Sequence, residues 1–139
     1  MTAATHSFGK AEKLKSRKQI EMLFREGQGF SVPPYRVLFQ VRPGEDSPPV
    51  QAAFSVPVAG FRLAVERNRI KRLTREAWRL QKQALYAELE ARELRLLVFL
   101  VYTGKKIPAF QTVRDKISVV LNRLISELPS AGPGRNAIR

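Results

Sequence analysis

The chain has 139 residues, of which 25 are Lys or Arg and 12 are Asp or Glu, so its formal net charge at pH 7 is +13. A charge of this size destabilises a compact chain through self-repulsion and favours a polyanionic partner. Hydrophobic residues make up 44% of the sequence, which excludes a disordered basic tail and fits one globular domain.

The sequence also argues against an oxidising compartment, a membrane span and secretion. It contains no cysteine, which excludes disulfides and cysteine-based metal sites and suits a reducing cytoplasm. The longest apolar run, Leu96 to Tyr102, is far shorter than the ~20 residues that a membrane span needs. The first residues are polar and carry no secretory signal pattern. We therefore expect a cytoplasmic protein that does not enter membranes.

Turn-forming and periodic residues predict helices that alternate with strands. Ser16, with Gln19 three residues later, is a suitable start for a short helix that Gly27 ends. An alternating strand, YRVLFQVR, precedes the turn-rich PGEDSPP and a returning strand. The expected elements begin with a flexible segment 1–13, a helix 16–26, an optional early strand near 29–34, and strands 35–42 and 50–56. A basic helix then follows residue 61 and runs to about residue 90. A strand 94–102, a helix 109–128 and a disordered tail 129–139 complete the chain.

The order of these elements predicts the fold class. The strand at 94–102 is nearly all apolar, as is typical of a strand covered on both faces. The last helix places its apolar residues on one face, and Pro129 stops it. The order α-β-β-α-β-α, with a third early strand as an option, predicts an α+β protein: a small α/β sandwich with helices packed on one sheet. Residues 14–128 would form its single domain.

The stretch RNRIKRLTREAWRLQK, residues 67–82, is the most strongly basic part of the chain. On a helix, Ile70, Leu73, Ala77 and Leu80 form an apolar stripe, and basic side chains line the neighbouring flanks. Like charges four residues apart repel each other, but a polyanion along the helix turns this into favourable counterion release. A solvated helix face explains most charge runs. The dominance of arginine, which binds phosphate through two parallel donors, favours a nucleic-acid face here.

Candidate catalytic groups are few. The only histidine, His6, lies in the segment expected to be flexible, and the only aspartates, Asp46 and Asp115, are far apart in sequence. The glycines, including GQG at residues 27–29, form no phosphate-binding loop. The sequence therefore does not predict a protein that cleaves a substrate by itself.

Aromatic residues offer a second candidate site. Exposed rings can stack on the bases of a single strand without reading its sequence. Core packing is the simpler expectation for each ring, and Trp78 in particular is expected to anchor the basic helix. The basic residues Arg17, Lys18 and Arg25 on the first helix nevertheless favour a basic, ring-lined groove there. The rings in or beside this region are Phe24, Phe30, Tyr35, Phe39 and Phe54.

The motifs just described resemble those of one known family. Ser55-Val56, Ala64-Val65, the block Arg67-Asn68-Arg69 and the pairs Lys71-Arg72 and Arg75-Glu76 match the signature of the bacterial ribonuclease P protein component. Upstream, LKSRKQIEMLFREG is similar to the opening helix of that family. The resemblance covers roughly residues 8–128.

The resemblance implies a protein subunit of a ribonucleoprotein enzyme whose active site is in its RNA. The protein would bind that catalytic RNA and the 5′ leader of precursor tRNA, as a monomer in a 1:1 complex, and Mg²⁺ would act through the RNA. The fold implied has a left-handed βαβ crossover, against the general rule. The residues implied to face the catalytic RNA are Arg62, Arg67, Asn68, Arg69, Lys71, Arg72, Arg75 and Arg79. Those implied to line a leader-binding cleft are Arg17, Lys18, Phe24, Phe39 and Ser55.

The chain departs from the family pattern at two places. Val58, Ala59 and Leu63 stand where basic residues are usual, and Ile20 stands where an aromatic residue is frequent. The sequence also leaves two other functions open. One is a general RNA-binding or ribosome-associated protein, and the other is a DNA-binding protein with the basic helix in a major groove.

Overall fold

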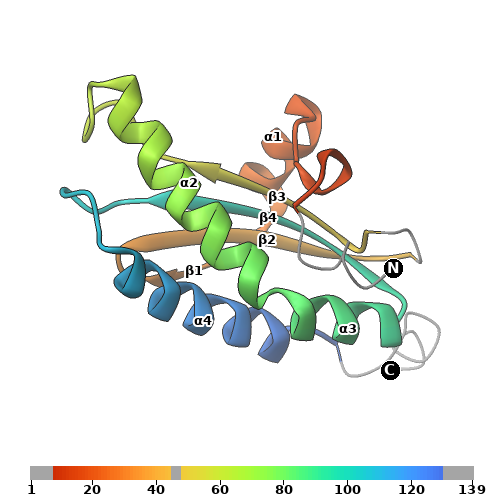
Figure 1. Ribbon diagram of the computed structural model, residues 1–139. Helices are drawn as coiled ribbons and strands as arrows, with labels where there is room; N and C mark the ends of the chain where they lie inside the picture. Colours follow the sequence, from red (N-terminus) through yellow and green to blue (C-terminus); the bar gives the residue numbers. More distant parts are fainter. Residues whose placement is uncertain (1–7, 45–47, 130–139) are drawn as a thin grey trace.

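The computed structural model describes residues 8–44 and 48–129, which fold around one sheet with helices on both of its faces (Figure 1). The short 3-10 helix η2 precedes the first α-helix. In chain order the elements are η2 (Lys10–Glu12), α1 (Arg17–Glu26), β1 (Gln28–Val32), β2 (Tyr35–Pro43), β3 (Val50–Ser55), α2 (Ala64–Gln81), α3 (Gln83–Ala91), β4 (Leu94–Tyr102) and α4 (Phe110–Ser126). The predicted α+β class and the order of elements are confirmed, and the early strand is present as β1.

The four strands lie in the order β1-β2-β4-β3. β1 and β2 are antiparallel, as are β2 and β4, whereas β3 and β4 are parallel and are joined through α2 and α3. In Figure 1, β3 and β4 both run to the left, β4 lies below β3, and α2 crosses in front of them. This arrangement is a left-handed crossover, as the family resemblance implied.

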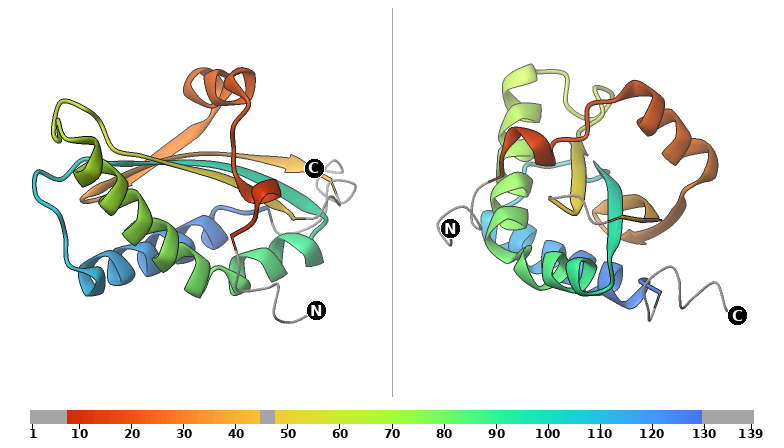
Figure 2. Two further views of the ribbon diagram at one scale, coloured as in Figure 1. Left: turned by 45° about the horizontal axis from the view of Figure 1, so that its top comes forward. Right: turned by 90° about the vertical axis from the view of Figure 1, so that its right-hand side faces the viewer.

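The two faces of the sheet have different covers, because side chains alternate along each strand. Leu96, Val98 and Leu100 of β4 join the main core beneath α2, α3 and α4. Leu97, between them, points to the other face and packs with Leu14 and Leu23 of the α1 region. Figure 2 shows α1 on one side of the sheet and α2, α3 and α4 on the other. We call the first side the α1-side face.

The helix boundaries follow the residues that predicted them, with one exception. The Ser16 hydroxyl accepts a hydrogen bond from the Gln19 N–H at 3.2 Å, and Gly27 caps the C-terminus of α1. The basic helix, expected to continue to about residue 90, is interrupted at Lys82, where α2 ends and α3 begins. The side chain of Lys82 is buried at this break.

Two further expectations need correction. Residues 8–13 were expected to be flexible, but η2 forms there, Glu12 is buried, and Lys13 forms an isolated bridge with Ala52 of β3. The polar residues of this segment are held by partners far away in sequence, which local composition does not reveal. The other correction concerns α2, where Ile70, Thr74, Ala77 and Trp78 are buried and Leu80 is 41% exposed. The buried stripe is thus rotated toward Trp78.

Parts of the expected organisation lie outside the described residues. These are most of the N-terminal segment, residues 1–7 with His6, the loop 45–47 with Asp46, and the tail from 130 to 139. Within residues 8–44 and 48–129, none of the helices combines the length and the apolar character that crossing a membrane requires.

Candidate nucleic-acid interface

The rotation of α2 divides its basic residues between two flanks. Asn68, Lys71 and Arg75 follow one another at spacings of three and four and therefore share a flank. Three residues after Arg75, Trp78 packs against Phe54 of β3, with 5.8 Å between ring centroids. This flank therefore borders the β3 edge of the sheet. Lys71 and Arg75 are half-buried there, and Asn68 is exposed.

The other flank of α2 faces the start of α4. Arg69 and Arg72 line a shallow cavity of about 260 Å³ together with Leu73, Glu76 and Phe110. Both arginines are exposed. A planar guanidinium next to an apolar ring provides a surface on which a phosphate and a sugar or base can both be bound.

Arg67 has a different environment from the other arginines. Its Nη1 donates hydrogen bonds to the carbonyl oxygens of Phe61 at 2.7 Å and of Arg62 at 2.8 Å. Phe61 is buried, and its ring centroid lies 6.1 Å from that of Tyr102. Arg67 therefore fixes the connection between β3 and α2. Arg62 itself is exposed on this connection, beside Leu63, whose apolar side chain is 60% exposed.

Arg79 is paired with an acidic residue one turn before it. Its Nε donates to Glu76 Oε1 at 3.1 Å, and its Nη2 forms an ion pair with Glu76 Oε2. The hydrogen bond from Arg79 lowers the pKa of the Glu76 carboxyl, and the same contact raises the pKa of Arg79. Both groups stay charged at neutral pH. The Glu76 carboxylate thus balances the charge of Arg79.

A buried hydrogen-bonded pair orients α2 on the sheet. The hydroxyls of Tyr35 on β2 and Thr74 on α2 lie 2.7 Å apart, and Thr74 donates to the carbonyl of Ile70 at 2.9 Å. Burial raises the pKa of Tyr35 to about 12, since the phenolate would be poorly solvated there. The pair therefore holds the buried stripe of α2 toward the sheet and its basic flanks outward.

The α1-side face carries a pair of aromatic rings, one exposed and one half-buried. Phe24 of α1 is 59% exposed, and its ring meets Phe99 of β4 edge to face with 5.2 Å between centroids. Leu38 lies opposite Phe99 in the sheet, and Ser55 lies opposite Val101, so these half-buried side chains share this face. An exposed ring above a partly apolar floor is suited to stacking an unpaired base. Phe99 was not predicted as a site residue.

The predicted residues of the leader-binding site are separated by the structure. Phe39 is only 2% exposed and packs against Phe30 with 5.8 Å between centroids. Strand alternation places it on the face toward the main core, so the structure does not bring Phe39 together with Phe24 in one cleft, as the resemblance implied. Arg17 is two helical turns from Phe24 and shares its flank. Lys18 lies on the outward surface of α1, away from the buried Leu23.

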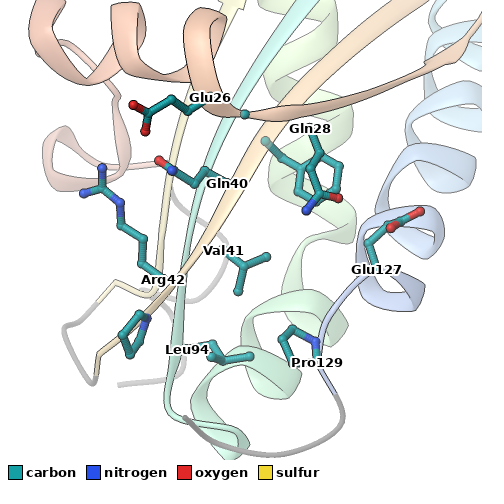
Figure 3. A pocket seen from close by; sticks show the side chains of 11 residues that line it. Glu26, Gln28, Gln40, Val41, Arg42, Leu94, Glu127 and Pro129 are labelled. Carbon is teal, nitrogen blue, oxygen red and sulfur yellow. The ribbon is translucent and has the colours of Figure 1, made fainter. Parts of the chain in front are cut away.

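A cavity of about 420 Å³ lies at the end of β2, between the C-termini of α1 and α4. Figure 3 shows Glu26, Gln40 and Arg42 on one side of β2, and Val41 and Glu127 on the other. The Arg42 Nη2 contacts the Met22 sulfur of α1 at 2.8 Å. The carboxylates of Glu26 and Glu127 disfavour a polyanion at this cavity. We therefore do not include it in the nucleic-acid face.

The described residues contain no grouping of three or more His, Cys, Asp or Glu side chains that could hold a metal ion. Asp115, one of the two aspartates, accepts a hydrogen bond from Gln111 at 2.9 Å on the exposed surface of α4.

Fold and site together define a small basic α+β protein with a cationic helix on one side of its sheet and an exposed phenylalanine, paired with a half-buried one, on the other. The family model for ribonuclease P matches residues 8–125. The ribonuclease P protein component of Porphyromonas gingivalis is 35% identical over 130 residues, covering 92% of this chain and 93% of that protein. That of Chlorobium phaeobacteroides is 33% identical over 135 residues, covering 88% and 92%. The chain belongs to the ribonuclease P protein family.

Solved structures support the same fold. The ribonuclease P protein of Staphylococcus aureus has a TM-score of 0.63 at 18% identity, covering 83% of this chain and 96% of that one. The protein from Thermotoga maritima also has a TM-score of 0.63, at 24% identity, covering 81% and 96%. At these identities the likeness is one of fold, and it includes the mixed sheet with helices on both faces.

Proposed function

We propose that this protein is the subunit of ribonuclease P that binds both the catalytic RNA and the 5′ leader of precursor tRNA. Its binding promotes removal of the leader and so generates the mature 5′ end of the tRNA. The observation that carries the proposal is the separation of two surfaces: the basic flanks of α2 on one side of the sheet and the Phe24–Phe99 pair on the other. One protein can then contact two RNA segments at the same time.

The catalytic RNA is assigned to α2. Arg69 and Arg72 are exposed, and Lys71 and Arg75 border the β3 edge, so phosphates can be contacted on both flanks of the helix. Each phosphate neutralised releases condensed counterions, which makes such binding strongly salt-dependent. Arg67 serves the same surface indirectly, by fixing the connection that carries Arg62.

The leader is assigned to the α1-side face. A leader is single-stranded, so its bases are free to stack on exposed rings such as Phe24. Arg17 lies on the same flank of α1 and supplies a positive charge for the leader phosphates. Ser55 lies on the same face of the sheet and offers a hydroxyl.

The chemistry of cleavage is assigned to the RNA, together with the Mg²⁺ that it binds. The metal would activate a water and stabilise the leaving oxygen, as metal ions do in other phosphodiester cleavages. The protein contributes by holding the two RNAs in one orientation. We place the complex in the cytoplasm, with one protein for each catalytic RNA; the lack of cysteine is compatible with that compartment.

Binding of two tRNA forms tests the proposal. The cognate catalytic RNA is assembled with the protein, and affinities for precursor tRNA and for mature tRNA are measured at fixed salt. The proposal predicts that the protein strengthens binding of the precursor and leaves that of mature tRNA almost unchanged. Equal strengthening of both would favour a general RNA-binding protein, and stronger binding to a DNA duplex than to either RNA would favour a DNA-binding protein.

A further inference from the structure

A buried ion pair joins the N-terminal segment to the break between α2 and α3. Glu12 is 8% exposed and Lys82 is 2% exposed, and their side chains meet with 2.6 Å between Lys82 Nζ and Glu12 Oε1. No other charged residues in the described part of the chain are buried. Removing two charges from water is costly, so such a pair is weak as a source of stability and calls for another explanation.

The carboxylate of Glu12 is the centre of a hydrogen-bond network. Oε1 also accepts from the Tyr86 hydroxyl at 2.6 Å, and Oε2 accepts from the backbone N–H of Gly9 at 2.9 Å. The ring centroid of Tyr86 lies 4.9 Å from the Lys82 ammonium. This network satisfies both oxygens of the carboxylate and fixes the direction from which the N-terminal segment approaches α3.

The chain continues from this network directly into α1. Two residues after Glu12, the Leu14 N–H donates to the Ala52 carbonyl of β3 at 2.9 Å. The Leu14 side chain then packs with Leu23 of α1 and Leu97 of β4. Figure 2 shows the turn of η2 beside α2, and the chain that follows it leading to α1 on the other side of the sheet.

We propose that Glu12 is a positioning residue that, through Lys82 and Tyr86, couples the α2–α3 unit to α1 and so presets the place of Phe24 above the sheet. The inference rests on the proposed function, because the value of a preset α1 is that the leader meets an ordered surface. Without the network, the segment from Gly9 to Leu14 exchanges between docked and undocked positions. The leader then binds only to the docked fraction.

Three variants test this role. Glu12→Gln weakens the network and leaves the Lys82 charge without its carboxylate. Glu12→Ala combined with Lys82→Met removes both charges, so that no unpaired charge is buried and folding is retained. The matched control is Glu127→Gln, which breaks the more exposed ion pair with Arg123 (3.0 Å between Arg123 Nε and Glu127 Oε2) at the end of α4.

Hydrogen exchange at the Leu14 amide gives the first measurement. We expect exchange there to be at least roughly tenfold faster in both Glu12 variants than in the wild type or the control, with the core strands unchanged, since local opening leaves the rest of the fold intact. Unchanged exchange at Leu14 in the folded double variant would overturn the proposal. This measurement needs no RNA, so it stands even if the proposed function fails.

Affinity for tRNA gives the second measurement, in complexes with the catalytic RNA. If the docked fraction falls to about one fifth, affinity for precursor tRNA falls about 5-fold, whereas that for mature tRNA does not change. An equal loss for both forms would show a merely structural role and overturn the assignment. If the wild-type complex does not distinguish precursor from mature tRNA, it is the proposed function that fails, and the exchange result alone decides the role of Glu12.

Discussion

Replacing Arg67 should separate two roles that the sequence cannot distinguish. The side chain donates two hydrogen bonds, at 2.7 and 2.8 Å, to the carbonyls of Phe61 and Arg62. Hydrogen bonds from a charged donor contribute roughly 1.5–3 kcal/mol each when buried. Because Arg67 is half-exposed, water compensates part of the loss, and we expect Arg67→Ala to cost about 1–2 kcal/mol for the pair. That corresponds to a decrease in melting temperature of about 4–8 °C for a domain of this size.

The same variant should change the salt dependence of RNA binding very little. Each phosphate contact contributes about 0.7–0.9 to the slope of log K against log salt. Arg69→Ala should lower the slope by that amount at unchanged melting temperature, because Arg69 is exposed and borders only the cavity near Phe110. A variant that combines Arg67→Ala with Arg69→Ala should therefore lose the salt dependence of about one phosphate contact, not two.

Thermal unfolding and a salt series of binding to the catalytic RNA provide the assay. Arg67→Lys is the matched control, since it keeps the charge but cannot reproduce the planar donor group; it should keep the salt slope and lose part of the stability. The reasoning is refuted if Arg67→Ala lowers the salt slope by a full contact while the melting temperature stays that of the wild type.

Three further predictions concern the aromatic pair, a buried tyrosine and the ion pair of α2. Phe24→Ala should weaken binding of precursor tRNA by about 1–3 kcal/mol, the contribution of one stacked base, and leave binding of mature tRNA unchanged. An equal loss of affinity for both tRNA forms would contradict this. Phe39→Ala should instead lower the free energy of unfolding, measured in urea, by about 3–5 kcal/mol. Because the folded-state pKa of Tyr35 is raised from 10.0 to about 12, its stabilising effect is complete below pH 10 and is lost as the pH rises from 10 toward 12. Tyr35→Phe should lower stability at pH 7 by about 1 kcal/mol and flatten the alkaline loss in unfolding experiments; an unaltered pH profile would argue against it. Glu76→Gln should remove the carboxylate that balances the Arg79 charge and raise the salt slope of RNA binding by about 0.7–0.9. A slope equal to that of the wild type would show that Arg79 does not reach a phosphate.

Much of the fold could be predicted because local patterns agree with it. The capping residue Ser16 and the terminal Gly27 set the bounds of α1, and the apolar run at residues 94–102 is the strand β4. The burial of Lys82 at the break between α2 and α3 could not be predicted, since the partner of its side chain is Glu12, which is 70 residues away in sequence. Composition suggested that the segment before residue 14 is flexible. It could not show the order found there, because the residues that hold the segment come from β3, the break at Lys82 and α3.

The candidate site was predicted in part, and the errors have a physical cause. The basic composition of α2 is evident in the sequence, but its rotation depends on the burial of Thr74 and Trp78, which a simple apolar stripe does not include. The sequence also does not show that Phe39 packs in the main core or that Phe99 lies on the α1-side face. In strands with few polar residues, alternation cannot show which side chains face the main core and which face α1. Pairing between strands decides this, and only the three-dimensional structure gives the pairing.

Cleavage of precursor tRNA at low magnesium tests the central proposal most directly. The cognate catalytic RNA is incubated with precursor tRNA alone, and then with this protein added, and the 5′ end of the product is mapped. We expect the protein to restore cleavage at the mature 5′ end under conditions in which the RNA alone is nearly inactive. If the protein binds the RNA with the expected salt dependence and the rate of cleavage at that position does not change, the proposed function is wrong.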